Sequence, residues 1–207
     1  MLSLTEPLKS SYTYQGKEYQ IDLSFDNVIR MYNLLEDDTF QDAEKIVIAF
    51  EMFFGFEPKD AEFAMKAIDE ITSYISKSAY GNDPVESDVV SSEVNTQKLF
   101  SYTQDAGAIY ASFKQQYNID LIAEQGKMHW DIFKALFDGL DENTCFRKIL
   151  DIRRKDVSDL QGKELTSAIE AQNYYELDEN KTVEAQEAKV ASFADSLKAL
   201  AQSWKGG

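Results

Sequence analysis

Residues 128–140, which read MHWDIFKALFDGL, decide the fold class of this chain. Trp130, Phe133 and Phe137 recur three and four positions apart, and this spacing places their rings on one face of a helix. Gly139 follows the last turn, where glycine commonly ends a helix. The stretch therefore predicts an amphipathic helix with an aromatic face, and whether this face packs against the core or against a partner stays open here.

Similar spacing recurs on both sides of this stretch and predicts further helices. Their predicted start signals are Ser24, Thr39, Pro58, Thr96 and Thr144, and their predicted ends are residues 36–38, Gly55 and Asn118. The positions expected on their apolar faces include Phe25, Val28, Ile29, Tyr32 and Leu35; Phe40, Ala43, Ile46, Val47, Phe50, Phe53 and Phe54; Ala61, Met65, Ile68, Ile71 and Ile75; Leu99, Tyr102, Ala106, Ile109, Phe113 and Tyr117; and Phe146, Ile149, Leu150 and Arg153.

The N-terminal region has a different pattern. Residues 12–22 are rich in Tyr, Thr and Ile around Gln15-Gly16, and the glycine can supply the positive φ of a tight turn. A short β-hairpin is predicted there. The sequence as a whole thus predicts a mainly α protein, in which a bundle of six to eight helices carries a small N-terminal β-hairpin.

Changes in composition divide the chain into four parts. Residues 1–77 hold the hairpin and three helices, and residues 78–95 lose the periodicity and are predicted to form an acidic flexible linker. Residues 96–160 are helical again. Residues 161–207 are expected to form C-terminal helices that serve as a partner-binding or oligomerisation extension.

The last predicted helix has apolar residues at heptad spacing, and we call them the C-terminal seam. A seam with a period near 3.5 can pack along another helix, in the same molecule or in a partner. An apolar stripe on a helix more often packs into the protein's own core. Because elements at the extreme C-terminus dock weakly unless they are held, this stripe is also a candidate partner-binding surface. The seam comprises Val183, Val190, Phe193, Leu197, Leu200 and Trp204.

Charge and composition exclude several classes of partner. The 207 residues carry 21 Lys and Arg against 37 Asp and Glu, a formal charge of −16, which disfavours nucleic acid and anionic membrane surfaces as partners. With 13 Phe, 11 Tyr and 2 Trp the chain can bury a core. The N-terminus lacks a signal-peptide pattern, and the most apolar stretch, residues 46–56, is too short to span a bilayer. We therefore expect a cytoplasmic protein.

Few residues are suited to catalysis or metal binding. His129 is the only histidine and Cys145 the only cysteine, so neither a multi-histidine metal site nor an internal disulfide can form. We expect Cys145 to be a half-buried packing residue and His129 a structural one. Phosphate-binding glycine loops, a GxSxG nucleophile motif and EF-hand spacing are missing from the sequence. The sequence thus indicates a non-enzymatic protein without cofactor or metal.

A resemblance to a known family covers most of residues 1–160. The residues that carry it are Asp105, Ile109, Phe113, Tyr117-Asn118-Ile119-Asp120-Leu121, His129-Trp130, Phe133, Leu136, Gly139-Leu140 and Arg153, with Leu4, Thr5, Gly16-Lys17-Glu18-Tyr19, Ile21, Phe25, Phe56, Pro58, Asp60 and Ala61 nearer the N-terminus. On these residues the chain resembles a family of small proteins from tailed phages and prophages of Gram-positive bacteria. Trp130, Phe133, Leu136 and Phe137 form the core of the shared motif.

The resemblance implies a function in phage tail assembly. In that family the gene lies just upstream of the gene for the tape measure protein, and the product is thought to be a tail assembly chaperone. Such a chaperone coats the tape measure protein in the host cytoplasm before the tail tube polymerises, and is expected to be absent from the mature virion. The resemblance implies the tape measure protein as the partner, and some such chaperones are also made in a frameshifted longer form. The C-terminal seam separately permits association with further copies of the chain.

Two alternatives stay open at this point. The first is a structural tail or connector component that is retained in the virion. The second is a small hydrolase that uses His129 together with nearby acidic residues.

Overall fold

The computed structural model describes residues 2–77 and 98–180 of the chain, and it is mainly α-helical. The predicted linker, Thr96 and all six residues of the C-terminal seam lie outside the described residues. The elements are β1 (Ser11–Tyr14), β2 (Lys17–Gln20), α1 (Phe25–Glu36), α2 (Asp42–Phe54), α3 (Ala61–Ile75), α4 (Ala106–Tyr117), α5 (Trp130–Asp138), α6 (Cys145–Arg154), α7 (Gly162–Tyr175) and the short 3-10 helix η2 (Asp178–Asn180). The predicted fold class is confirmed.

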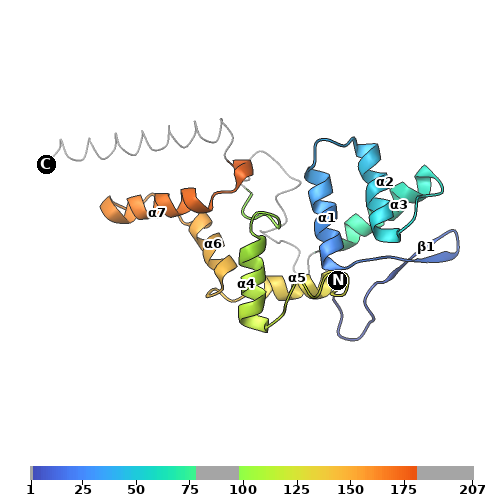
Figure 1. Cartoon of the computed structure of the whole chain (residues 1–207), viewed down its shortest axis with the longest axis horizontal. Coiled ribbons are helices and arrows are strands. Elements are labelled where there is room, and N and C mark those ends of the chain that lie inside the picture. Colours follow the sequence, from blue (N-terminus) through green and yellow to red (C-terminus); the bar gives the residue numbers. More distant parts are fainter. Residues whose placement is uncertain (1, 78–97, 181–207) are drawn as a thin grey trace.

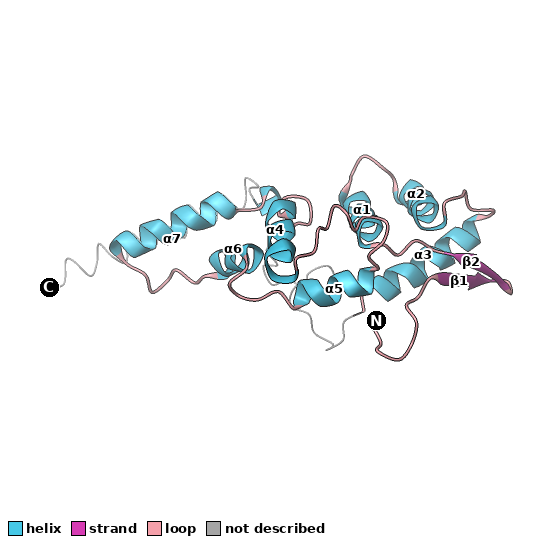
Figure 2. Cartoon of the chain, turned by 60° about the horizontal axis from the view of Figure 1, so that its bottom comes forward, coloured by secondary structure: helices cyan, strands magenta, loops and turns pink. Residues whose placement is uncertain are grey.

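The helices form two groups that meet at α5 (Figures 1 and 2). Helices α1, α2 and α3 lie with the hairpin at one end, where α2 packs against both α1 and α3. Helices α4, α6 and α7 lie at the other end, where α6 packs against both α4 and α7. Helix α5 contacts α1, and the ring of its Phe133 stacks on that of Phe113 from α4 with 5.2 Å between ring centroids, so this short helix contacts both groups. The four-part division of the chain stays a prediction.

The hairpin forms where the sequence predicts it. Strands β1 and β2 are antiparallel, with Tyr12 opposite Tyr19 and Tyr14 opposite Lys17. Both turn residues have left-handed backbone, with φ of 48° at Gln15 and 76° at Gly16, as expected for the two-residue turns that match the twist of a hairpin. Glycine indicated the turn in the sequence, whereas glutamine gives no such signal.

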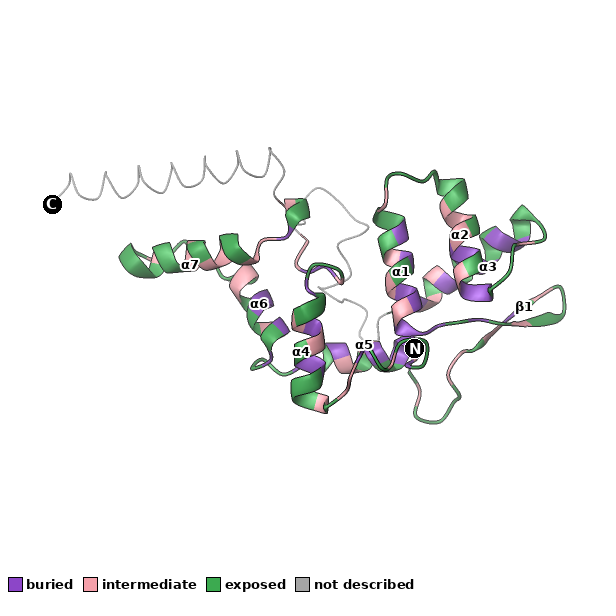
Figure 3. Ribbon diagram, viewed as in Figure 1, coloured by how far each residue is buried: buried purple, intermediate pink, exposed green. Residues whose placement is uncertain are grey.

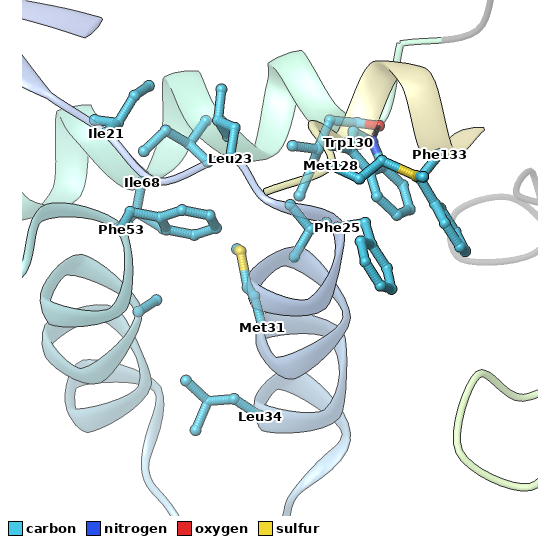
Figure 4. Packing of buried hydrophobic residues seen from close by; sticks show 14 of the residues in the cluster. Ile21, Leu23, Phe25, Met31, Leu34, Phe53, Ile68, Met128, Trp130 and Phe133 are labelled. Atoms are coloured by element: carbon cyan, nitrogen blue, oxygen red, sulfur yellow. Dashed lines mark hydrogen bonds between the residues drawn. The ribbon is translucent and has the colours of Figure 1, made fainter. Parts of the chain in front are cut away.

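Helix α5 lies in the hydrophobic core, so the structure assigns its aromatic stripe to the core. Trp130, Phe133 and Phe137 are buried, and Leu136 is half-buried against the same core. The ring of Phe133 stacks on that of Phe25 from α1, with 4.8 Å between ring centroids (Figure 4). Residues from both groups of helices therefore share one core.

Backbone hydrogen bonds reinforce the junction between α1 and α5. The N–H of Phe25 donates to the carbonyl oxygen of Met128 over 2.9 Å, and the N–H of Trp130 donates to the carbonyl oxygen of Leu23 over 2.7 Å. These two bonds form an antiparallel bridge between Ser24 and His129, the residues just before the two helices. The side chain of Ser24, predicted as an N-cap, makes no capping hydrogen bond.

Three predicted helix starts are wrong. Helix α3 begins at Ala61 after the N-cap Asp60, whose carboxylate accepts a hydrogen bond from the N–H of Phe63 over 2.7 Å, so Pro58 lies before the first turn of the helix. Helix α2 begins after Gln41, which forms a capping box with Glu44, because Thr39 instead donates to the carboxylate of Asp37 in the preceding turn. Helix α4 begins at Ala106 rather than near Thr96, because residues 102–105 form turns.

Helices α1, α2 and α3 each carry both buried and exposed residues (Figure 3), and several residues predicted to face the core are among the exposed ones. Leu35, Val47 and Met65 are exposed, whereas Leu34 and Phe63 occupy buried positions near them. The helical period is right in these cases, but the buried face is rotated by one or two residues. Where a helix carries more apolar residues than one face holds, only the packing partner decides which residues are buried.

No helix within residues 2–77 and 98–180 is both long enough and apolar enough to cross a membrane.

Candidate functional site

A pocket of about 330 Å³ opens where the two groups of helices meet. Buried side chains of Phe25, Ile109, Leu121 and Phe133 form part of its wall, and the exposed Ile122 also lines it. Its volume lies at the lower end of the range typical of small binding sites, and its lining is mostly apolar, as in such sites. The full lining consists of Phe25, Asp26, Ile29, Arg30, Tyr102, Ala106, Ile109, Tyr110, Leu121, Ile122, Gln125 and Phe133.

One ion pair borders the pocket. The guanidinium of Arg30 donates to one carboxylate oxygen of Asp26, and the N–H of Gly126 donates to the other over 2.8 Å. Burial disfavours ionisation of Asp26, but the hydrogen bonds from Gly126 and Arg30 outweigh it and hold the pKa of Asp26 below its ordinary value. Asp26 thus stays ionised and anchors the turn before α5 to α1.

The two charged side chains of this pair differ in accessibility. The side chain of Asp26 is 11% exposed, whereas that of Arg30 is 62% exposed. Because a guanidinium has five N–H donors, Arg30 can bind a further carboxylate while it keeps its bond to Asp26. The pocket can therefore accept a bulky apolar side chain next to an acidic one.

His129 occupies a structural position at the start of α5. Its Nδ1 accepts a hydrogen bond from the N–H of Asp131 over 3.1 Å, as an N-cap does. The proton therefore lies on Nε2, which donates to the carbonyl oxygen of Lys9 over 2.9 Å. Both ring nitrogens are engaged by the backbone.

The acidic side chain nearest to His129 in sequence is also engaged. Asp131 accepts a hydrogen bond from the hydroxyl of Tyr74 over 2.6 Å, which ties the last part of α3 to the start of α5. Burial, together with this bond to a carboxylate, raises the pKa of Tyr74. The indole N–H of Trp130 donates to the carbonyl oxygen of Ile75 over 3.1 Å at the same junction.

Cys145 differs from its prediction. It is the first residue of α6 and its side chain is exposed rather than half-buried, because Phe146 takes the inward position beside it. In the described part of the chain, no hydrogen bond joins Cys145 to His129. Across the same residues, no group of three or more His, Cys, Asp or Glu side chains is placed to hold a metal ion.

The structure contains a buried ion pair that was not predicted from the sequence. Arg153 makes a bidentate pair with Asp105, with N to O distances of 2.7 and 2.8 Å. Arg153 also donates to the carbonyl oxygens of Leu99 over 2.9 Å and Tyr175 over 2.6 Å. The N–H of Ser101 donates to Asp105 over 3.0 Å. This network joins α4, α6, the end of α7 and the segment before α4.

The sequence contains a weak signal for this pair. Arg153 falls on the apolar face predicted for α6, where a charged residue is unusual unless it is paired. Asp105 and Arg153 are also among the residues that carry the family resemblance. Their side chains are nevertheless 48 positions apart, and no helical or strand period links residues at that separation.

The structure gives the family-motif residues a role in the core. Trp130, Phe133 and Phe137 are buried, and Leu136 is half-buried, so this stripe packs inside the protein. The candidate partner-binding residues of the C-terminal seam lie outside the described residues, and their role stays a prediction.

Comparison with known families gives one match. The model of the family described as "Bacteriophage Gp15 protein" matches residues 4–177, well over half of the chain. No curated protein and no solved structure matches this chain.

Proposed function

This chain belongs to the Bacteriophage Gp15 protein family, and from that premise we propose that it is a tail assembly chaperone that binds and solubilises the tape measure protein before the tail tube polymerises. Family membership across residues 4–177 is the observation that carries the proposal. The charge, the core and the position of His129 support it physically.

The engagement of the lone histidine favours a non-catalytic function. A general base needs a ring nitrogen within reach of the proton that it removes, and both nitrogens of His129 are bonded to backbone groups. In the proposed chaperone, His129 therefore serves as the N-cap of α5, and the function that we propose is binding of the client.

The C-terminal seam is the surface that we propose for the client. The aromatic stripe of α5 packs against the protein's own core, so it is unavailable to a partner. The seam has the heptad spacing required to lie along a helix, from Val183 to Trp204. A tape measure protein that is not yet enclosed exposes long apolar helical surface, and helix-to-helix contacts of this kind cover it.

The acidic charge suits such a coat. A formal charge of −16 on each copy makes coated complexes repel one another, which keeps an otherwise insoluble client in solution. Many weak contacts along one client give high avidity, yet each can be displaced singly when tube subunits compete.

Co-expression with the adjacent tape measure protein tests the proposal. We expect the client to be soluble and to co-elute with this chain in size exclusion, and to aggregate when expressed alone. Trp204→Glu is expected to abolish co-elution, whereas the matched control Ser203→Glu is expected to keep it. A client that is equally soluble and unbound without this protein would overturn the proposal.

Mass spectrometry of purified particles separates the chaperone from a virion component. A chaperone that leaves before assembly ends is expected to be missing from particles and present in the host cytoplasm. Stoichiometric recovery of the chain in particles would favour a structural tail or connector protein instead.

A further inference from the structure

We propose that copies of this chain associate head to tail, with the turn between α1 and α2 of one copy inserted into the pocket of the next. The turn comprises residues 35–40, and the pocket is the one lined by α1, α4, α5 and the turn at residues 121–125. This surface is separate from the C-terminal seam, and the inference does not depend on the proposed function.

The α1–α2 turn carries exposed apolar side chains that suit insertion into an apolar pocket. Leu35 is 45% exposed and Phe40 is 40% exposed, so the turn presents two large apolar residues to solvent. Asp38 lies between them and is exposed as well. In Figure 1 the turn is at the upper edge of the molecule, away from the hairpin and α5.

Local bonds hold this turn in one conformation. The carboxylate of Asp37 accepts hydrogen bonds from the N–H and the hydroxyl of Thr39, over 2.9 and 2.6 Å. The ammonium of Lys45 donates to the carbonyl oxygen of Leu35 over 2.8 Å, and Lys98 pairs with Glu36 over 2.6 Å. A turn fixed in this way loses little conformational entropy when it binds.

The pocket is complementary to the turn in chemistry. Its wall is apolar and suits Phe40 or Leu35, and Ile122 adds apolar area because it is 66% exposed. Arg30 beside the pocket can bind the free carboxylate of Asp38. Apolar side chains flanking an acid on the turn therefore match an apolar pocket flanked by a guanidinium.

The complementary turn belongs to a second copy, because the turn of one molecule cannot reach the pocket of that same molecule. The pocket uses residues at the start of α1, up to Arg30, whereas the turn begins at the end of this helix. At about 1.5 Å per residue, the helix from Arg30 to Glu36 is roughly 9 Å long, and Asp38 lies beyond its end. The helix therefore holds the turn away from the pocket within one molecule.

Two different patches make a heterologous contact. Such a contact leaves one free turn and one free pocket at the ends of every assembly, so it generates open chains unless the rotation closes a ring. The contact is small, and we expect weak association with a dissociation constant on the order of 100 µM.

Sedimentation velocity of the full chain tests the inference. From about 10 µM to about 1 mM, the weight-average mass of the wild type is expected to rise without a plateau at the dimer. Phe40→Asp and Arg30→Glu, each alone, are expected to remain monomeric. Met65→Asp, an exposed apolar position on α3, is the matched control and is expected to associate like the wild type.

Mixing the two defective variants gives the decisive result. Phe40→Asp keeps an intact pocket and Arg30→Glu keeps an intact turn, so an equimolar mixture is expected to form dimers and nothing larger. Combining Arg30→Glu with Asp38→Arg in one chain is expected to restore association, because the two charges are exchanged.

Cross-linking provides a measurement that does not depend on these variants. In a Cys145→Ser background, Asp38→Cys together with Ile122→Cys is expected to give a ladder of disulfide-linked species. A monomeric wild type across the series, a mixture without dimers, or a missing ladder would each overturn the inference. If association survives Phe40→Asp but is lost in Trp204→Glu, the copies associate through the C-terminal seam instead. If the wild type is monomeric and Arg30→Glu no longer binds the tape measure protein, the pocket binds this client instead.

Discussion

Removing Arg153 is expected to destabilise the protein more than removing any exposed cation. Its side chain is 8% exposed and that of Asp105 is 4% exposed. Replacement with methionine keeps much of the volume but leaves the Asp105 carboxylate buried, and among the described residues its remaining donor is the N–H of Ser101. It also leaves the carbonyl oxygens of Leu99 and Tyr175 without the bonds from Arg153.

The size of the effect follows from these losses. Breaking a buried ion pair by removing one partner costs about 3–5 kcal/mol, because the other charge stays buried. For a chain of this length each kcal/mol lowers the melting temperature by about 2–4 °C, so Arg153→Met is expected to melt about 6–20 °C below the wild type. Urea unfolding followed by far-ultraviolet circular dichroism measures the free energy directly.

The neighbouring residue offers a matched control. Arg154 is exposed on the same helix, and Arg154→Met is expected to change the free energy of unfolding by less than about 0.5 kcal/mol. A double-mutant cycle with Asp105→Asn is expected to show a coupling energy above about 1 kcal/mol. If Arg153→Met costs no more than Arg154→Met, the network does not hold α4, α6 and α7 together and this reasoning is wrong.

Three further predictions concern α5 and its surroundings. His129→Ala is expected to cost about 0.5–2 kcal/mol of stability in chemical denaturation, while His129→Asn, a good N-cap, retains most of it; equal losses would contradict a capping role. Phe133→Ala is expected to cost about 3–5 kcal/mol, against less than about 0.5 kcal/mol for the exposed Met65→Ala, and similar values for the two would show that the buried face is misassigned. The lowered pKa of Asp26 means that its ionised form stabilises the fold above the ordinary carboxyl pKa of 3.8, and that this stabilisation is lost as the pH falls through the lowered pKa. The difference in unfolding free energy between the wild type and Asp26→Asn is therefore expected to be constant near neutral pH and to shrink in acid; a difference that grows on acidification would contradict this assignment.

The sequence predicts turns, helix ends and amphipathic faces well here because the signals for them are local. The hairpin at Gln15-Gly16, the end of α2 at Gly55 and the end of α4 at Asn118 all depend on backbone conformations that one or two residues favour. The amphipathic pattern of α5 is confirmed for the same reason, since residues three and four positions apart lie on one side of a helix.

Errors occur where competing local bonds or packing partners decide the outcome. Thr39 has the chemistry of an N-cap, but its hydroxyl bonds to Asp37 and the helix begins after Gln41. Leu35 is apolar at a plausible spacing, yet it is exposed because α1 packs against α2 and α5 through other residues. Neither the competing hydrogen bond of Thr39 nor the choice of packing residues on α1 can be predicted from the helical spacing of apolar residues.

The sequence by itself determined the helical character of this protein, its N-terminal hairpin, its acidic charge and the stripe that became its core, because each depends on residues within a few positions of one another. The tertiary structure alone decided the pocket beside Arg30 and the network around Arg153. Both bring together side chains from segments far apart in the chain, and only the packed fold sets such distances.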